Sequence, residues 1–433
     1  MAGQAPRTDR AARAPSTTIR PHFRPRTALK NRGHPQRSEG PAALAGASQR
    51  ETALQFPLGL SLLLLGAFAI REVALELRPS WLRPGLHLFA YVGNTADGTV
   101  SAIDLIKLAT VATISVGPGP SGLRPHPTRP EIWGISSTGG YVWVLDCRSN
   151  RVATQIPVGS EPYALDFSPD GRLVYVAASG ANTVLAIDTL SHRIVARGRA
   201  GKRPWIARVS PDGKMIVVSN RDDGTVSLLD ATTLAQSAVI SALPDPEQIV
   251  ILPDGSKAFV TSGTTNQISV IDLKRKVLLA NLALGGPPND LVLKPDGGEL
   301  YIPSRDTHGL LIVNTGTNEV SDFILLGMSP VAATFEPATE TLYVSDFDAD
   351  HIVPVAVATR QVGRPIQAGD GPSTLRLTPG GDILLVIDTN SDDLAAIRTK
   401  ILPTGQASLS PPRPPTGLIP LGGSPRDLAI KVF

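Results

Sequence analysis

The sequence contains a single cysteine, Cys147, among its 433 residues. One thiol cannot form an intramolecular disulfide, a cysteine-based zinc site or the Cys-x-x-Cys-His attachment site of a c-type haem. Aromatic residues are also few, at 5% of the chain, whereas the 40 glycines and 39 prolines make up nearly one residue in five. Because glycine and proline favour turns over helices, this composition excludes a helical bundle.

Basic residues are concentrated at the N-terminus. Residues 1–52 contain ten Lys/Arg and three Asp/Glu, a net charge of +7, and the whole chain sums to +3. Residues 53–433 therefore carry a net charge of −4. A nucleic-acid-binding domain usually shows a basic stripe on its folded part. No nucleic-acid partner is expected.

The one long uncharged hydrophobic stretch runs over residues 52–70, between Arg50 and Arg71. Its length suits either a signal peptide, with cleavage after Ala69, or an uncleaved membrane anchor. We therefore expect a disordered basic tail over residues 1–51, the export segment at 52–70 and a linker at 71–87. A tail of this length before a signal peptide is unusual, so a start codon further downstream is an alternative. The expected location is periplasmic, secreted or at the cell surface, with membrane contact only through residues 52–70.

A repeat with a period of 42 residues organises the remainder of the chain. One series of hydrophobic residues keeps this spacing throughout: Tyr91, Trp133, Tyr175, Val217, Phe259, Tyr301, Tyr343 and Leu385. A series of prolines keeps it as well: Pro120, Pro162, Pro204, Pro246, Pro288, Pro330 and Pro372. Each unit contains four short runs rich in β-formers, separated by turn signals such as Pro-Asp-Gly at residues 169–171. Four strands per unit at this period predict an all-β, single-domain β-propeller over residues 88–433.

The number of blades follows from the order of the strands. Eight sets of second and third strands are present, but the first set has no inner strand before it. Residues 422–430, Gly-Gly-Ser-Pro-Arg-Asp-Leu-Ala-Ile, match the inner-strand pattern. We therefore predict eight blades, with the C-terminal strand completing the first blade and closing the ring. Seven blades is the alternative if the first or last blade has degenerated.

Two units carry a resemblance to a known family. The fourth unit, Asp212-Gly-Lys-Met-Ile-Val-Val-Ser-Asn220 followed by Gly224-Thr-Val-Ser-Leu-Leu-Asp230, resembles the YVTN-type repeat of bacterial and archaeal β-propellers. The third unit, Asp170-Gly-Arg-Leu-Val-Tyr-Val-Ala-Ala178 followed by Asn182-Thr-Val-Leu-Ala-Ile-Asp-Thr189, is similar. The resemblance implies a secreted, periplasmic or surface-associated propeller. Wider relatives include sugar-lactone hydrolases, haem d1 domains and quinoprotein subunits, so the family gives a fold and no single activity.

Two groups of residues are candidates for a site. Ligands of propellers usually meet the channel mouth, where each inner strand begins, and the polar and aromatic residues expected there are Glu161, Tyr163, Arg203, Trp205, Glu247, Asn289 and Arg426. Neighbouring loops of the last two blades carry carboxylates that suit a hard cation such as Ca²⁺: Asp346, Asp348, Asp350 and Asp388. The alternatives are a water-filled mouth without a ligand, and aspartates that only stabilise turns.

The absence of a nucleophile elbow, a phosphate loop or a histidine pair at metal-ligand spacing favours a non-catalytic module. We therefore expect an exported, monomeric binding propeller with no cofactor other than Ca²⁺, presenting its mouth to a small ligand or protein partner. A metal-dependent hydrolase of the sugar-lactonase type is one alternative. A redox accessory protein carrying a quinone or haem is the other.

Overall fold

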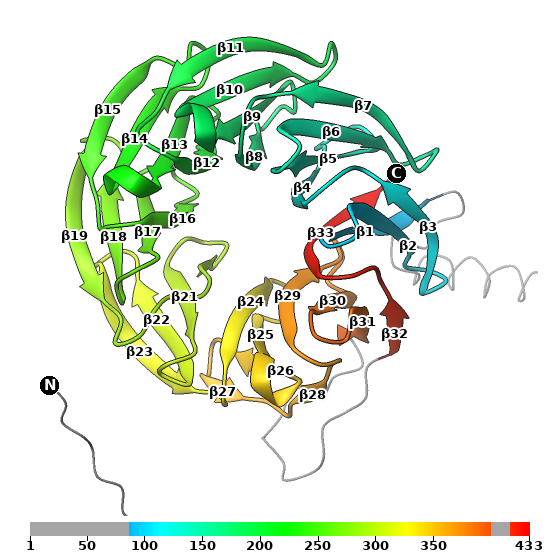
Figure 1. The fold of residues 1–433 in the computed structure, drawn as a ribbon. Helices are drawn as coiled ribbons and strands as arrows, with labels where there is room; N and C mark the ends of the chain where they lie inside the picture. The colour runs from blue at the N-terminus through cyan, green and yellow to red at the C-terminus, as the bar shows by residue number, and fades with distance from the viewer. Residues whose placement is uncertain (1–85, 400–415) are drawn as a thin grey trace, which may run out of the picture. The chain divides into compact units, whose positions relative to one another are not determined.

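The computed structural model describes residues 86–399 and 416–433, so the tail, the export segment and most of the linker lie outside the described residues. Eight antiparallel sheets surround a central axis, as Figure 1 shows. The predicted eight-bladed propeller is therefore confirmed. Among the described residues, no helix combines the length and the hydrophobicity needed to cross a bilayer.

Each blade contains an inner strand at the axis followed outward by three further strands. The strands of blades one to four, inner strand first, are β33 (Pro425–Val432), β1 (Leu88–Asn94), β2 (Thr99–Asp104) and β3 (Ala109–Ser115); β4 (Pro120–Pro125), β5 (Glu131–Ser136), β6 (Tyr141–Asp146) and β7 (Arg151–Pro157); β8 (Pro162–Phe167), β9 (Leu173–Ala178), β10 (Thr183–Asp188) and β11 (Arg193–Arg199); β12 (Pro204–Val209), β13 (Met215–Asn220), β14 (Thr225–Asp230) and β15 (Gln236–Ser241).

Blades five to eight repeat the arrangement. Their strands are β16 (Pro246–Ile251), β17 (Lys257–Ser262), β18 (Gln267–Asp272) and β19 (Val277–Ala283); β20 (Val292–Leu293), β21 (Glu299–Ser304), β22 (Gly309–Asn314) and β23 (Glu319–Leu325); β24 (Pro330–Glu336), β25 (Thr341–Asp346), β26 (His351–Ala356), β27 (Gln361–Val362) and β28 (Ile366–Gln367); β29 (Pro372–Leu377), β30 (Ile383–Asp388), β31 (Asp393–Arg398) and β32 (Gly417–Pro420). Three short 3-10 turns follow second strands: η2 (Ser179–Ala181), η3 (Arg221–Asp223) and η4 (Phe347–Ala349).

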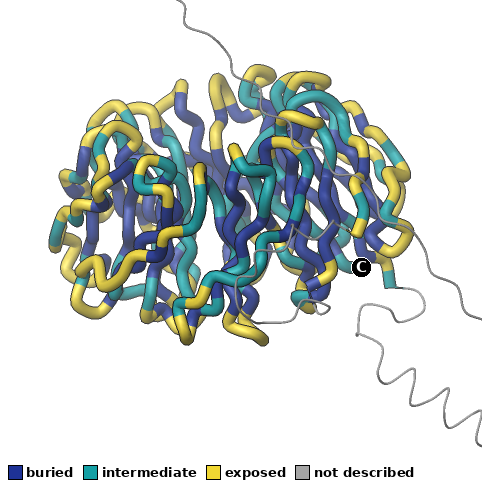
Figure 2. Tube along the Cα trace, turned by 90° about the horizontal axis from the view of Figure 1, so that it is seen from below, coloured by how far each residue is buried: buried dark blue, intermediate teal, exposed yellow. Residues whose placement is uncertain are grey.

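The hydrophobic series with the 42-residue spacing forms the core between blades. All eight of its members, from Tyr91 to Leu385, are at most 4% exposed. Each contributes to a cluster that joins neighbouring blades; Tyr91 of blade one, for example, packs with Ile132 and Trp143 of blade two. Figure 2 shows the result, a buried band across the middle of the blades with exposed turns at both ends. Because every blade buries one such residue against its neighbour, the residue recurs once per blade, and the sequence period corresponds to one blade.

The C-terminal strand closes the ring as predicted. β33 pairs antiparallel with β1 over the register Leu88↔Val432 to Asn94↔Pro425. The rings of His87 and Phe433 stack with centroids 5.3 Å apart at the end of this pairing. Closure covers the edge of β1 that would otherwise be unpaired.

Two blades depart from the regular pattern, and prolines explain both departures. In blade six, β20 pairs with β21 over only two residues, because Pro303 on β21 has no N–H to offer the preceding part of the inner strand. In blade seven, the outer strand is broken into β27 and β28, which flank the position opposite Pro354 of β26. Pro354 has no N–H to donate across this gap. Its carbonyl accepts a hydrogen bond from the N–H of Gly363 at 2.7 Å.

Candidate functional site: the central channel

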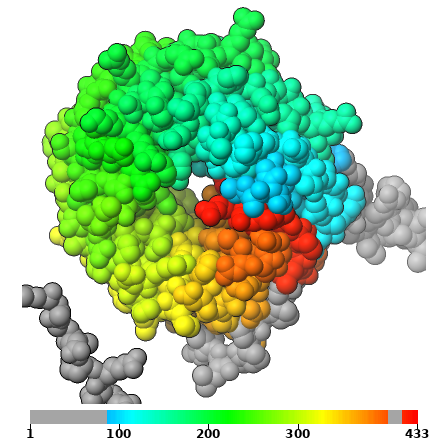
Figure 3. Space-filling view, in the orientation of Figure 1, coloured from blue at the N-terminus to red at the C-terminus, as the bar shows by residue number. Residues whose placement is uncertain are grey.

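Inner strands place every second side chain toward the axis, because successive residues of a strand alternate between its two faces. The residues four positions after the first residue of inner strands β4, β8, β12 and β29 are Arg124, Asp166, Arg208 and Arg376. All four line cavities that lie along the axis. The space-filling view shows the corresponding opening at the centre of the ring (Figure 3).

Two cavities of about 490 Å³ each lie among the inner strands. Arg208 and Arg376 line both of them, and Arg124 lines one. Each volume lies within the range of small-molecule pockets in proteins, roughly 300–1,000 Å³. The channel therefore has the size and the positive charge to receive an organic anion.

The aspartates of the channel are used by the backbone. Asp166 accepts hydrogen bonds from the N–H groups of Phe167 and, in the next blade, Val209, both at about 3 Å. Asp290 and Asp427 join their neighbouring blades in the same way. Each carboxylate thus links one inner strand to the next, so these groups do not neutralise the arginines by direct ion pairs.

Of the three arginines that line the channel cavities, Arg208 has the fewest hydrogen-bond partners. Arg124 and Arg376 each donate to a carbonyl of their own strand, at 2.9 and 2.8 Å. Arg208 makes no side-chain hydrogen bond with any residue in the described part of the chain. Burial and the nearby Arg124 lower the pKa of Arg208 to about 10, so the guanidinium remains charged at neutral pH. A charged, half-buried donor without a direct acceptor favours an anionic ligand.

An aromatic stack stands at the mouth of the channel. The rings of Tyr163 and Trp205, the second residues of β8 and β12, lie with their centroids 3.3 Å apart. The guanidinium of Arg221 covers Trp205 at 4.4 Å from the ring centroid and forms ion pairs with Asp245 and Glu247. Three of the predicted mouth residues, Tyr163, Trp205 and Glu247, are therefore brought together, and Arg221 completes the group.

The other four predicted mouth residues are more dispersed. Glu161 and Arg203 occupy exposed turns with positive φ, and Arg203 lies 5.9 Å from the Trp205 ring centroid. Asn289 lines a channel cavity and accepts the N–H of Arg305. Arg426 is exposed at the start of β33. Ligand binding by this set remains a prediction.

The predicted metal ligands do not converge. Asp346 accepts the N–H groups of Met328 and Ser329 at 2.8 and 2.7 Å, and Asp350 accepts that of Gly371 at 3.0 Å. Asp348 is exposed in η4, and Asp388 is buried against Asp393 in blade eight. Within residues 86–399 and 416–433, no three His, Cys, Asp or Glu side chains are placed to hold a metal ion. Asp346 and Asp350 instead stabilise the backbone of neighbouring turns.

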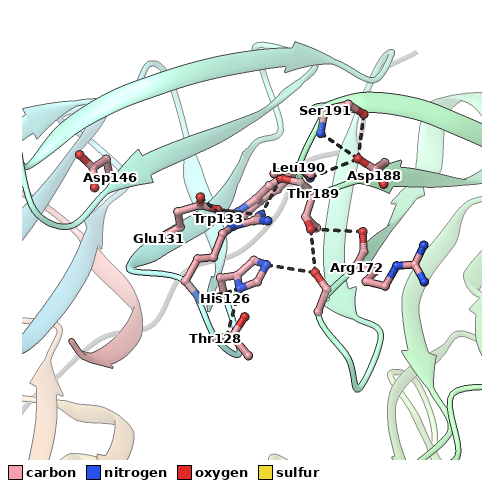
Figure 4. A network of polar contacts seen from close by, with 12 residues as sticks. His126, Thr128, Glu131, Trp133, Asp146, Arg172, Asp188, Thr189, Leu190 and Ser191 are labelled. Carbon is pink, nitrogen blue, oxygen red and sulfur yellow. Dashed lines mark hydrogen bonds and ion pairs between the residues drawn. The ribbon is translucent and has the colours of Figure 1, made fainter.

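Histidine does not line the two channel cavities either. His126 directly follows the last residue of β4 and is part of a buried polar network between blades two and three (Figure 4). Its Nε2 donates to the carbonyl of Gly171 at 3.0 Å, and its Nδ1 accepts N–H groups of Thr128 and Arg129. Burial, followed by the nearby Arg129, lowers the pKa of His126. Both ring nitrogens are therefore occupied by the fold.

The arginines of the channel were missed by sequence reasoning, which considered only the first residues of each inner strand. The signal was nevertheless present. Arg124, Arg208 and Arg376 are separated by 84 and 168 residues, which are multiples of the 42-residue period, so they occupy one repeat position.

Comparison with known proteins adds a family signal. Residues 135–262 match the Cytochrome D1 heme domain family, a span from the end of β5 to the end of β17 that covers most of blades two to five and includes Arg208. No curated protein matches the sequence. Two solved structures share the fold. Dihydro-heme d1 dehydrogenase NirN in complex with DHE aligns with a TM-score of 0.66 at 16% identity, over 78% of this chain and 74% of its own. Hydrazine synthase of Kuenenia stuttgartiensis aligns with a TM-score of 0.52 at 18% identity, over 66% of this chain and 97% of its own.

These findings correct two predictions. The expectation of a non-catalytic binding module is wrong, because the match to a haem-domain family favours the redox alternative. The expectation of no cofactor other than Ca²⁺ is wrong as well, because the match is to a haem domain. Sequence reasoning failed here because the repeat pattern is shared by propellers with and without cofactors, and only the channel differs between them.

Proposed function

We propose that the channel of this propeller binds a haem-type tetrapyrrole and that the protein acts in redox chemistry. The observation that carries the proposal is the position of Arg208, an unpaired charged side chain of the channel, within the segment that matches the haem-domain family. Haem-type tetrapyrroles are planar and carry carboxylates, and arginine binds carboxylates through paired, charge-assisted hydrogen bonds.

The fit is to the acidic edge of the tetrapyrrole. Arg124, Arg208 and Arg376 would hold its carboxylates, since all three line the axial cavities. The described residues around these cavities include no histidine, cysteine or methionine, the side chains that most often ligate haem iron. When bound, the group would supply the electron-transfer chemistry. The role of this chain is to bind and orient it and to limit its contact with water.

An exported location is part of the proposal. The uncharged stretch at residues 52–70 and the basic residues before it are typical of an export signal. Membership of the YVTN-type repeat proteins remains a finer prediction within the propeller fold, based on the repeats at residues 212–220 and 224–230.

A titration with matched ligands tests the proposed function. The purified protein is titrated with haem and, in parallel, with haem whose carboxylates have been converted to methyl esters, and absorbance reports binding. We expect saturable binding of one haem per chain and much weaker binding of the ester, because the ester cannot accept charge-assisted bonds from arginine. Equal affinity for the two ligands, or no saturable binding of either, would overturn the proposal.

A further inference from the structure

The last residue of each second strand faces the start of the third strand, and its partner differs between blades. In blade one, Asn94 donates through Nδ2 to Thr99 and Ser101, at 3.0 and 2.9 Å. In blade four, Asn220 makes the same two bonds, to Thr225 and Ser227, at the same distances. Blades one and four thus use a buried amide donor and hydroxyl acceptors at this position.

Blade eight replaces both partners with acids. Asp388 occupies the position of Asn94 and Asn220, and Asp393 occupies that of Thr99 and Thr225 in the paired register. Asp388 is 0% exposed and packs against Gly369. Among the described residues, neither of its carboxyl oxygens, nor Oδ1 of Asp393, accepts a hydrogen bond of good geometry, although the N–H groups of Gly369 and Ala395 lie near Asp388. Two carboxylates therefore meet where the other two blades hold a donor and an acceptor.

Blade seven shows how an aspartate at this position is stabilised as an anion. Asp346 accepts the N–H groups of Met328 and Ser329. The corresponding residues of blade eight are Asp370 and Gly371, 42 positions later. Their N–H groups are used elsewhere, by Oγ of Ser391 and by Oδ1 of Asp350. Asp388 therefore lacks the two donors that stabilise Asp346, and the nearby N–H groups of Gly369 and Ala395 only partly replace them.

The charged groups around Asp388 are all acidic. On β31 the facing group is Asp393, and the adjacent turns contribute Asp350, Asp370 and Asp392, which accept bonds from Gly371, Asn390 and Ser424, respectively. No lysine, arginine or histidine among the described residues interacts with Asp388. Burial, and then the hydrogen-bonded Asp393, raise the pKa of Asp388 to about 9.

We propose that Asp388 and Asp393 bind one proton between them and that this proton holds the turn on which ring closure depends. The turn between β30 and β31 anchors the segment that leads into β33: Asp392 accepts the N–H of Leu421 through its carbonyl and that of Ser424 through Oδ1, both at 2.9 Å. With the proton bound, Asp388 becomes a donor to Asp393, as Asn94 is to Thr99. Loss of the proton leaves two buried like charges beside the closing strand.

The sign of the pH dependence follows from linkage. The folded pKa of Asp388 lies above its ordinary value of 3.8, so the folded state retains a proton that the unfolded state releases. The resulting stabilisation is complete below pH 4 and is lost as the pH rises through the folded pKa near 9. Asp388→Asn supplies a permanent donor and removes this dependence.

The test compares unfolding by denaturant in the native protein, D388N and the double variant D388N/D393T, which introduces the Asn/Thr pair of blades one and four. We expect D388N to gain stability, with an unfolding constant that falls relative to the native protein by about tenfold per pH unit between pH 5 and pH 8. D346N is the matched control, because Asp346 accepts two N–H groups as an anion; it should lose stability. At pH 9, amides of β33 should exchange more slowly in D388N than in the native protein.

Infrared spectroscopy of the native protein provides a readout that requires no variant. A protonated buried carboxyl should give a carbonyl band at neutral pH that disappears on raising the pH above 9 and is missing in D388N. Parallel pH profiles for D388N and the native protein, lower stability of D388N at every pH, or absence of this band would each overturn the proposal. None of these results depends on whether the channel binds a tetrapyrrole.

Discussion

Replacing Arg208 with glutamine should have opposite effects on stability and on ligand binding. The guanidinium lies half-buried in the channel near Arg124 and has no direct acceptor among the described residues, so the more distant Asp166 and Asp427 only partly offset the cost of its charge. Its charge is therefore unfavourable in the empty channel and becomes favourable only when an anion is bound. If Arg208 merely supported the fold, its replacement would lower both the stability of the protein and its affinity for the ligand.

The stability effect can be worked out from the pKa. A decrease from 12.5 to about 10 corresponds to roughly 3 kcal/mol against the charged form. Because water in the channel screens the charge, we expect about 1 kcal/mol of stabilisation in Arg208→Gln. At about 2 cal/mol/K of unfolding entropy per residue, this raises Tm by about 1–2 °C for a domain of this size. The gain applies at neutral pH and disappears as the pH rises above 10, where the native guanidinium loses its charge.

The binding effect should be larger. A charge-assisted hydrogen bond contributes about 1.5–3 kcal/mol, so its loss should raise the Kd for haem by about 10–100-fold. Melting curves of the ligand-free protein and absorbance titrations measure the two effects. Arg151→Ala, on the exposed outer strand β7, is the control and should change neither. An Arg208→Gln protein with lower Tm and unchanged Kd would refute the reasoning.

Two further predictions concern the fold. Burial raises the pKa of Cys147 to about 12, and the residue is 2% exposed. Its thiol should therefore resist maleimide at pH 8 in the folded protein and react fully in denaturant. Rapid labelling of the folded protein would contradict the buried position. Removal of residues 421–433 deletes β33 and opens the ring between blades eight and one. The truncated chain should therefore show no cooperative melting by circular dichroism. A melting curve like that of the whole protein would show that ring closure is dispensable.

The fold was predictable because each blade repeats the same few structural requirements. Burial of one side chain per unit, as at Tyr91 and Trp133, and a proline at the start of most inner strands produced series that could be counted. The pairing of β33 with β1 also followed from the count, since one inner strand was missing at the beginning. Hydrophobic burial and turn chemistry act locally and therefore leave a periodic pattern.

The site was predicted only in part, because it depends on departures from the period. Tyr163, Trp205 and Glu247 do gather at the mouth, but the ion pairs that Arg221 makes with Asp245 and Glu247 correspond to no pattern in the sequence. The cluster of aspartates around Asp346 looked like a cation site, whereas its carboxylates are occupied by backbone N–H groups. Composition alone cannot distinguish a carboxylate that binds a metal from one that stabilises a turn.

Diffraction at the iron absorption edge, from crystals grown with haem, tests the central claim most directly. The account predicts one anomalous peak per chain inside the ring, with carboxylates of the haem within hydrogen-bonding distance of Arg208. Iron bound on the outer surface, or a channel without iron at saturating haem, would contradict it.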